Sequence, residues 1–237
     1  MTVKPASTVV LIRDSEQGIE VFLVRRHAGL AFMGGAHVFP GGQLDEGDRA
    51  TAHSGLSDDI HIATSRLTDV DNATALAFHV AAVRETFEES GVRLALDSLV
   101  YFAWWVTPEF EHRRFDTRFF LAPAPPDQVA AHDEGETTEG VWVRPVDALA
   151  QCLRDEMALA PPTWTTLRWL EPFGDADAAL LWARTRPVHR IQPVVVDQGE
   201  ARLVTLPDAA TLPGVAAERR FLLKAGRWRP LGANEEI

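Results

Sequence analysis

The stretch of sequence that decides the fold is Arg84-Glu85-Thr86-Phe87-Glu88-Glu89-Ser90-Gly91-Val92. It closes a segment, 73–90, whose apolar residues recur with the period of an α-helix. Four of these residues form one stripe: Leu76, Val80, Val83 and Phe87. Gly91 favours the left-handed backbone conformation that ends a helix. The pattern predicts a helix over residues 73–90 that is buried along this stripe and capped by Asp71, Asn72 or Thr74.

Three carboxylates share one face of this helix. Glu88 and Glu89 follow Glu85 by three and four positions, so we expect them on the outward face, opposite the apolar stripe. Like charges at this spacing destabilise a helix, and a bound cation removes that cost. Oxygen ligands without cysteine or paired histidines favour Mg²⁺ or Mn²⁺ over zinc. Arg84 lies four positions before Glu88 and is expected to pair with it; a solvated acidic face is the alternative interpretation.

Strands are expected on both sides of the helix. Two β-branched apolar runs, 8–13 and 20–26, predict a hairpin. A third run, 36–39, ends at Pro40-Gly41-Gly42, where we expect strand pairing to stop and bare backbone to approach a ligand. Further strands are predicted at 99–106, 114–121, 140–143, 194–196, 201–206 and 220–224, and helices at 145–157, 163–170 and 176–184. This order predicts a layered α/β (α+β) fold with a mixed sheet covered by helices.

The composition is that of an ordinary globular protein. The chain has 237 residues, of which 46% are hydrophobic and 24% charged. We expect a main domain over residues 1–160, with a polar insertion at about 49–73 that holds one short helix near 58–67. Residues 161–237 are expected to form an extension of helices and strands packed on the same domain.

Charge and cysteine content exclude several classes of function. A net charge of −11 argues against DNA or RNA as the main ligand, although a small anionic substrate remains compatible. No apolar run is long enough to span a membrane, and the N-terminal residues lack a secretory signal. The single cysteine, Cys152, allows no internal disulfide and is expected in the core. We therefore expect a cytoplasmic protein.

The two halves of this pattern together resemble the Nudix box. The box of Nudix hydrolases runs Gly, five residues, Glu, seven residues, and then Arg-Glu-hydrophobic-x-Glu-Glu-x-Gly-hydrophobic. Gly42 matches its first glycine, and residues 84–92 match its second half except for Thr86 at an apolar position. This chain has Asp48 in place of the first Glu, and 35 residues rather than seven separate it from Arg84.

The resemblance implies an α/β/α sandwich and a metal-dependent hydrolase that splits a diphosphate bond. It implies that Glu85, Glu88, Glu89 and Asp48 bind Mg²⁺ or Mn²⁺ and that Arg84 orients the carboxylates. A divalent metal neutralises charge on the diphosphate and acidifies the attacking water, whose proton passes to a carboxylate. Glu85 is one candidate for this general base. Glu139, expected in a loop that faces the box, is the other.

The substrate is inferred mainly from a further resemblance. Leu23-Val24-Arg25-Arg26-His27 and the segment from Gly35 to Gly42 are similar to part of the coenzyme A diphosphatase signature, although Ala31 and His27 depart from it. The insertion in the box resembles a branch of the family that releases (acyl)phosphopantetheine and adenosine 3′,5′-bisphosphate. Expected substrate contacts are Arg25, Arg26, Gly41, Gly42, Arg114 and Trp105.

Two alternative functions and the oligomeric state stay open. Pro108, sixteen residues after Val92, is similar to the proline marker of ADP-ribose diphosphatases. A domain that senses a nucleotide without cleaving it is the alternative of another class, but such domains tend to lose the box carboxylates. The partner is expected to be a small nucleotide diphosphate, and the sequence leaves a homodimer open.

Overall fold

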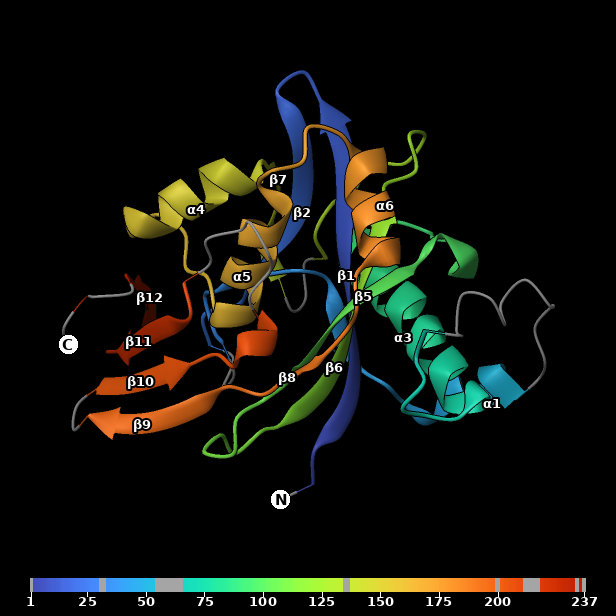
Figure 1. The fold of residues 1–237 in the computed structure, drawn as a ribbon. Coiled ribbons are helices and arrows are strands. Elements are labelled where there is room, and N and C mark those ends of the chain that lie inside the picture. Colours follow the sequence, from blue (N-terminus) through green and yellow to red (C-terminus); the bar gives the residue numbers. More distant parts are fainter. Residues whose placement is uncertain are drawn as a thin grey trace.

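A mixed β-sheet lies at the centre of the protein, in a computed structural model that describes residues 2–29, 33–53, 66–133, 137–198, 201–210, 218–232 and 235 (Figure 1). Its strands are β1 (Lys4–Ser15), β2 (Gly18–Arg26), β3 (His37–Val38), β4 (Gly41–Gln43), β5 (Val100–Val106), β6 (Phe115–Pro123), β7 (Thr137–Val143) and β8 (Arg190–Ile191). Their order is β3-β2-β1-β6-β5-β8, with β7 on β2 and β4 on β1. β1 runs parallel to β6 and antiparallel to both β2 and β4.

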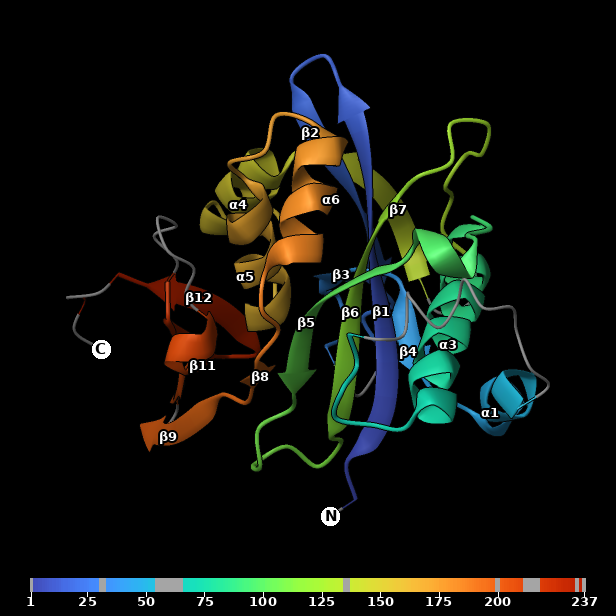
Figure 2. The same cartoon turned by 45° about the vertical axis from the view of Figure 1, so that its right-hand side comes forward.

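Helices cover both faces of this sheet (Figure 2). α1 (Glu46–His53) and α3 (Asn72–Ser90) lie on one face; α4 (Pro145–Leu153), α5 (Pro161–Leu170) and α6 (Ala176–Thr185) lie on the other. Alternate residues of β1 serve the two cores: Val9 and Leu11 pack with α3, whereas Val10 and Ile12 pack with α4, α5 and α6. The expected α/β/α sandwich with a mixed sheet is confirmed.

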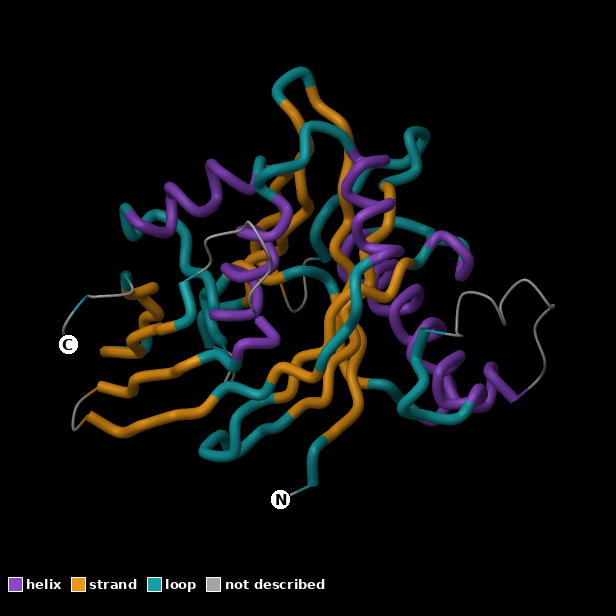
Figure 3. Tube along the Cα trace, in the orientation of Figure 1, coloured by secondary structure: helices purple, strands orange, loops and turns teal. Residues whose placement is uncertain are grey.

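The C-terminal segment forms a second sheet. Its strands are β9 (Val194–Gln198), β10 (Ala201–Thr205), β11 (Arg220–Lys224) and β12 (Arg227–Leu231), in the order β12-β11-β10-β9 (Figure 3). Two short 3₁₀ turns, η1 (Leu96–Ser98) and η2 (Asp208–Ala210), complete the assigned elements. Val204 and Phe221 of this second sheet belong to the same buried cluster as Leu167 of α5. The segment after residue 160 therefore shares the core of the central sheet.

The helix expected over 73–90 is present as α3, and the stripe predicted to bury it is confirmed for Leu76, Val80 and Val83 but wrong for Phe87. Asp71 caps the helix by accepting a hydrogen bond from Thr74 N at 2.7 Å, and Gly91 ends it with a φ of 70°. Phe87 is 39% exposed, whereas Thr86 and Glu89 are buried. The buried face carries Ala75, Ala81 and Ala82, whose small side chains let α3 approach the sheet closely.

Three other expectations need correction. Pairing does not stop at Pro40, because Gly41 and Gly42 form β4 and pair with Thr8 and Ser7 of β1. Glu139 lies in strand β7 and not in a loop. Of the helix expected near 58–67, only residues 66 and 67 are described, and neither is helical; the rest lies outside the described residues. Helix α1 was not anticipated.

Cys152 is a free, buried thiol, and burial raises its pKa, as expected for a core residue. Among the helices in the described ranges, none combines the length and apolar character that crossing a membrane requires.

Buried His79 of α3 links the stability of the fold to pH. Its ring packs against that of Phe120 in a tilted arrangement, at 4.6 Å between centroids, and its Nδ1 lies 2.9 Å from the carbonyl oxygen of Ala75. Its Nε2 has no hydrogen-bond partner among the described residues. Burial lowers the pKa of His79 to about 4, so the folded protein holds a neutral ring that the unfolded chain protonates near pH 6.5.

This His79 environment predicts a loss of stability as the pH falls from about 6.5 towards 4, because the unfolded state then binds the extra proton. Between pH 7.5 and 5.5 the loss attributable to His79 is about 1 kcal/mol. Urea unfolding of wild type and His79→Phe at the two pH values measures it. The variant should lose less stability by that amount; an equal loss in both proteins would contradict the assignment.

Candidate active site

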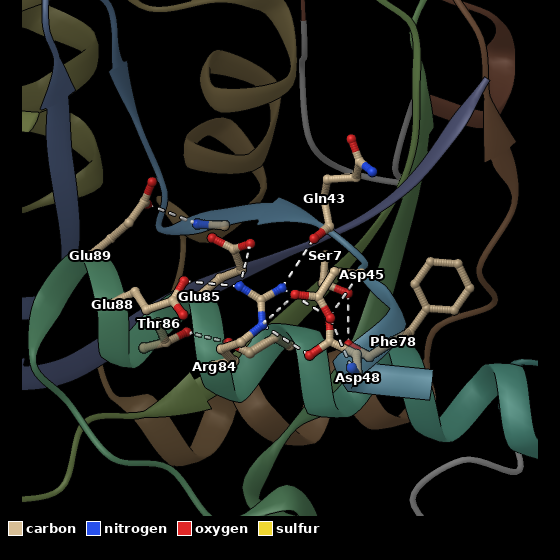
Figure 4. Close-up of polar contacts among 12 residues, drawn as sticks. Ser7, Gln43, Asp45, Asp48, Phe78, Arg84, Glu85, Thr86, Glu88 and Glu89 are labelled. Atoms are coloured by element: carbon tan, nitrogen blue, oxygen red, sulfur yellow. Dashed lines mark hydrogen bonds and ion pairs between the residues drawn. The ribbon is translucent and has the colours of Figure 1, made fainter. Parts of the chain in front are cut away.

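Arg84 is the centre of the polar cluster on α3 (Figure 4). Its Nε and Nη2 donate to the two carboxylate oxygens of Asp48 in α1, each at 2.9 Å. Its Nη1 donates to Glu85 Oε1 at 2.8 Å and to Glu88 Oε2 at 2.9 Å, as the i, i+4 spacing predicts. Nη2 also donates to the carbonyl of Gln43, at 3.1 Å. These contacts raise the pKa of Arg84, with the hydrogen bonds to Asp48 as the main cause.

The two glycines of β4 bring backbone against the glutamates. Gly41 N donates to Glu89 Oε2 at 3.0 Å, so this carboxylate is buried and points towards the strand. A Cβ on Gly42 would lie 2.4 Å from the carboxylate of Glu85. Burial raises the pKa of Glu85, and the charge of Arg84 partly opposes that shift. Glu85 and Glu89 are therefore directed at β4 and not outward as the sequence predicted, whereas Glu88 remains about half exposed.

A cavity of about 630 Å³ opens at this meeting point of α3 and β4. This volume is typical of a pocket for a small ligand. Seven of the residues proposed from the sequence line it: Arg26, Gly41, Gly42, Glu85, Glu88, Glu89 and Trp105. The structure thus gathers the three glutamates of the box and the two glycines at one site.

The remaining proposed residues lie elsewhere. Asp48 is buried behind Arg84, where both of its oxygens accept from the guanidinium. Glu139 Oε2 is 3.9 Å from Arg25 Nη1, and both side chains are about half exposed on neighbouring strands. Arg114 donates from Nε to the carbonyl of Thr107 at 3.3 Å. None of these side chains is among the described residues that line the cavity.

The cavity also contains residues that the sequence did not single out. Asp133, on the loop before β7, lines it and accepts a hydrogen bond from Thr137 Oγ1 at 2.6 Å. It is a loop acid facing the box, the position expected of Glu139. The sequence feature that could have identified Asp133 is the acidic run that precedes β7. Arg113 and Trp228 line the cavity as well, but no local pattern marks them.

The donor set of the cavity suits a hard divalent cation. Among the described residues, no three His, Cys, Asp or Glu side chains are grouped closely enough to hold a metal by themselves. The reason is visible in the contacts: Arg84 holds Glu85 and Glu88, and Gly41 holds Glu89. Mg²⁺ usually binds through one or two carboxylates plus substrate phosphates and water, so such a cage is not required. The glutamates are compatible with that mode.

Comparison with known proteins shows relatives of one kind. No family model matches the chain. The human acyl-coenzyme A diphosphatase NUDT19 is 25% identical, over 81% of this chain and 72% of that protein. The putative nudix hydrolase 7 of Caenorhabditis elegans is 24% identical, over 81% and 68% of the two chains. A NUDIX hydrolase structure from Alicyclobacillus acidocaldarius is 25% identical over 76% of this chain and 96% of that one, with a TM-score of 0.63.

These similarities agree with the architecture and with the box. The sandwich is the fold that the Nudix resemblance implied, and Gly42 meets Glu85 despite the 35 residues between Asp48 and Arg84. Taken together, the relatives, the fold and the gathering of the box glutamates at one cavity make this chain similar to the Nudix hydrolases, and these similarities indicate a pyrophosphohydrolase.

Proposed function

We propose that the chain hydrolyses the diphosphate of coenzyme A or acyl-coenzyme A, using Mg²⁺ or Mn²⁺, to (acyl)phosphopantetheine and adenosine 3′,5′-bisphosphate. The observation that carries the proposal is the convergence of Glu85, Glu88 and Glu89 on one cavity beside the bare backbone of β4. The similarity to the human acyl-coenzyme A diphosphatase supports this choice of substrate.

The metal would be held by the glutamates of α3 together with the substrate. Glu88 is about half exposed and carries an oxygen that does not contact Arg84, which makes it accessible to a cation. Glu85 and Glu89 line the same cavity and offer the further carboxylate oxygens. When bound, Mg²⁺ or Mn²⁺ would neutralise charge on the diphosphate oxygens and acidify the attacking water.

Glu85 is the general base in this proposal. Its Oε1 accepts from Arg84, which leaves Oε2 to receive the proton of the attacking water. Arg84 is a positioning residue, because one of its nitrogens fixes Glu85 and Glu88 while Asp48 holds the other side of the guanidinium. Asp48 therefore acts through Arg84; a direct metal contact would require it to leave this ion pair.

Two arginines of the cavity are suited to the anionic part of the substrate. Arg26 and Arg113 both line it, and a guanidinium binds phosphate oxygens through two parallel hydrogen bonds. Trp105 supplies a wall and not a free stacking surface, since it is buried against Phe119 and Trp169. The backbone of Gly41 and Gly42 lies close to the carboxylates because neither residue has a side chain.

The substrate is tested first with a panel of coenzyme A, acetyl-coenzyme A, ADP-ribose, NADH and UDP-glucose, each with Mg²⁺ and with Mn²⁺. We expect coenzyme A and its acyl derivatives to be preferred. Glu85→Gln should lower kcat by about 10²–10⁴-fold because the general base is lost. Glu46→Gln, which changes an exposed acid of α1 outside the cavity, is the matched control and should retain activity.

Each other outcome of the panel has a distinct meaning. Preferred cleavage of ADP-ribose would retain the diphosphohydrolase chemistry and reject the coenzyme A substrate. Binding of nucleotides without turnover by either metal form would favour the sensing domain. Full activity of Glu85→Gln would remove Glu85 from the role of base.

Gly42→Ala tests the close approach between β4 and α3. The new Cβ would overlap the Glu85 carboxylate, which is the mobile end of a side chain, so Glu85 is expected to move while the fold persists. We expect kcat to fall by about 10²-fold, the loss typical of a small misplacement of a reacting group, with little change in Tm. Gly174→Ala, which has nothing within 4 Å, is the control. An unchanged kcat in Gly42→Ala would show that this approach is not needed.

A further inference from the structure

The cavity has two chemically different parts. Its acidic and basic lining residues among the described positions all come from residues 26–133, and they are Arg26, Glu85, Glu88, Glu89, Glu111, Arg113 and Asp133. Every lining residue after position 133 is uncharged; these include Pro161 and Pro162 at the start of α5, Pro193 before β9, and Val204 and Trp228 of the second sheet. Among the described residues, charge is thus supplied to the cavity by the central sheet, α3 and their loops, and not by the C-terminal segment.

The second sheet turns a largely apolar face to this cavity. Val204 pairs with Phe221, and Trp228 pairs with Leu223, which places these four side chains on one face. Val204 and Phe221 are buried in the core, and Trp228 is half-buried against it. Arg202 pairs with Leu223 and so lies on the same face, with its guanidinium 4.8 Å from the ring centroid of Phe110 on the loop between β5 and β6. The sheet therefore meets the active-site loop directly.

The two parts of the cavity are lined by elements on different sides of the central strands. In Figures 1 and 2, α3 and the second sheet stand on opposite sides of β1 and β6, and the cavity is lined from both. Under the proposed function, a substrate that reaches both parts would place its anionic group beside α3, where a divalent cation and the arginines Arg26 and Arg113 would offset the charge of the glutamates. An uncharged, largely apolar arm would extend from there to the second sheet. Burying that arm is favourable in proportion to the apolar area removed from water.

We propose that the C-terminal sheet is the substrate-selecting wall of the enzyme, and that Trp228 contacts the S-acyl chain at the end of the pantetheine arm of acyl-coenzyme A. This inference rests on the proposed function for the identity of the arm. Trp228 determines specificity and takes no part in the hydrolysis. Its rigid, half-exposed indole offers a large apolar contact at a small cost in side-chain entropy.

The experiment measures binding and turnover separately in the full-length chain. S-acyl pantetheines with acetyl, butyryl, hexanoyl and octanoyl groups carry the arm without the diphosphate, and calorimetry gives their affinities. We expect affinity to rise by up to about fourfold for each added methylene. Trp228→Ala should lower the octanoyl affinity by about tenfold, and Trp228→Leu by less.

Turnover of the matching acyl-coenzyme A series completes the test. In Trp228→Ala, kcat/KM should fall more for octanoyl-coenzyme A than for coenzyme A. Trp142→Ala is the matched control: this half-buried tryptophan of β7 packs on Phe22 at 5.3 Å and lies outside the cavity. It should leave the dependence on chain length unchanged.

The possible failures are distinguishable. The proposed function stands but the role of the C-terminal sheet is rejected if coenzyme A is cleaved and acyl chain length has no effect on affinity or kcat/KM. The same conclusion follows if Trp228→Ala lowers kcat/KM equally for all substrates. Failure to cleave any coenzyme A derivative rejects the proposed function. The affinities for the S-acyl pantetheines then decide by themselves whether the C-terminal sheet binds the acyl arm. If the wild type does not bind the S-acyl pantetheines, the role of the C-terminal sheet is rejected whether or not coenzyme A is cleaved.

Discussion

The site depends on the ion pair between Arg84 and Asp48. The Arg84 guanidinium donates to the Asp48 carboxylate of α1 on one side and to two glutamates of α3 on the other, and it also donates to the carbonyl of Gln43 in β4. Like charges three and four positions apart repel each other on a helix, and Arg84 offsets that repulsion before any cation is present. It therefore fixes Glu85 and Glu88 relative to the strand. Without this cation, neighbouring carboxylates would be left partly buried without their counter-charge.

The second constraint is the approach of bare backbone to the helix. β1 is long enough to pair with β2 over one half and with β4 over the other, so the central strand itself carries Gly41 and Gly42 to the glutamates. A side chain at Gly41 would overlap the backbone of β1, at 2.3 Å from Ser7 O. Ser7 Oγ in turn donates to the carbonyl of Phe78 in α3, at 2.7 Å. The sheet, the strand edge and the helix are thereby held in one arrangement.

Much of the fold could be predicted from the sequence, because the hydrophobic periodicity of an element and the capping or turn residues at its ends are local properties. The hairpin of β1 and β2, the caps of α3 and the three later helices follow from such patterns. The buried face of α3 could not be fully predicted, because the burial of Ala82 and Glu89 in place of Phe87 depends on how closely the helix lies against the sheet. The site shows the same limit. Spacing found the three glutamates, but only the tertiary structure places Asp48 behind Arg84 and replaces Glu139 by Asp133 at the cavity.

The long interval between Asp48 and Arg84 has a consequence for how such a protein can change over time. The Nudix box is joined by contacts and not by chain continuity, so its two halves need only meet in space. Lengthening such a connection costs little, because the entropy of loop closure grows only with the logarithm of length, by about 0.6 kcal/mol for each doubling. The charge-assisted hydrogen bonds of the Arg84–Asp48 pair are of comparable size. Segments of new sequence can therefore accumulate between α1 and α3 with little loss of stability, which makes this junction a natural place for acquired functions and for engineered insertions.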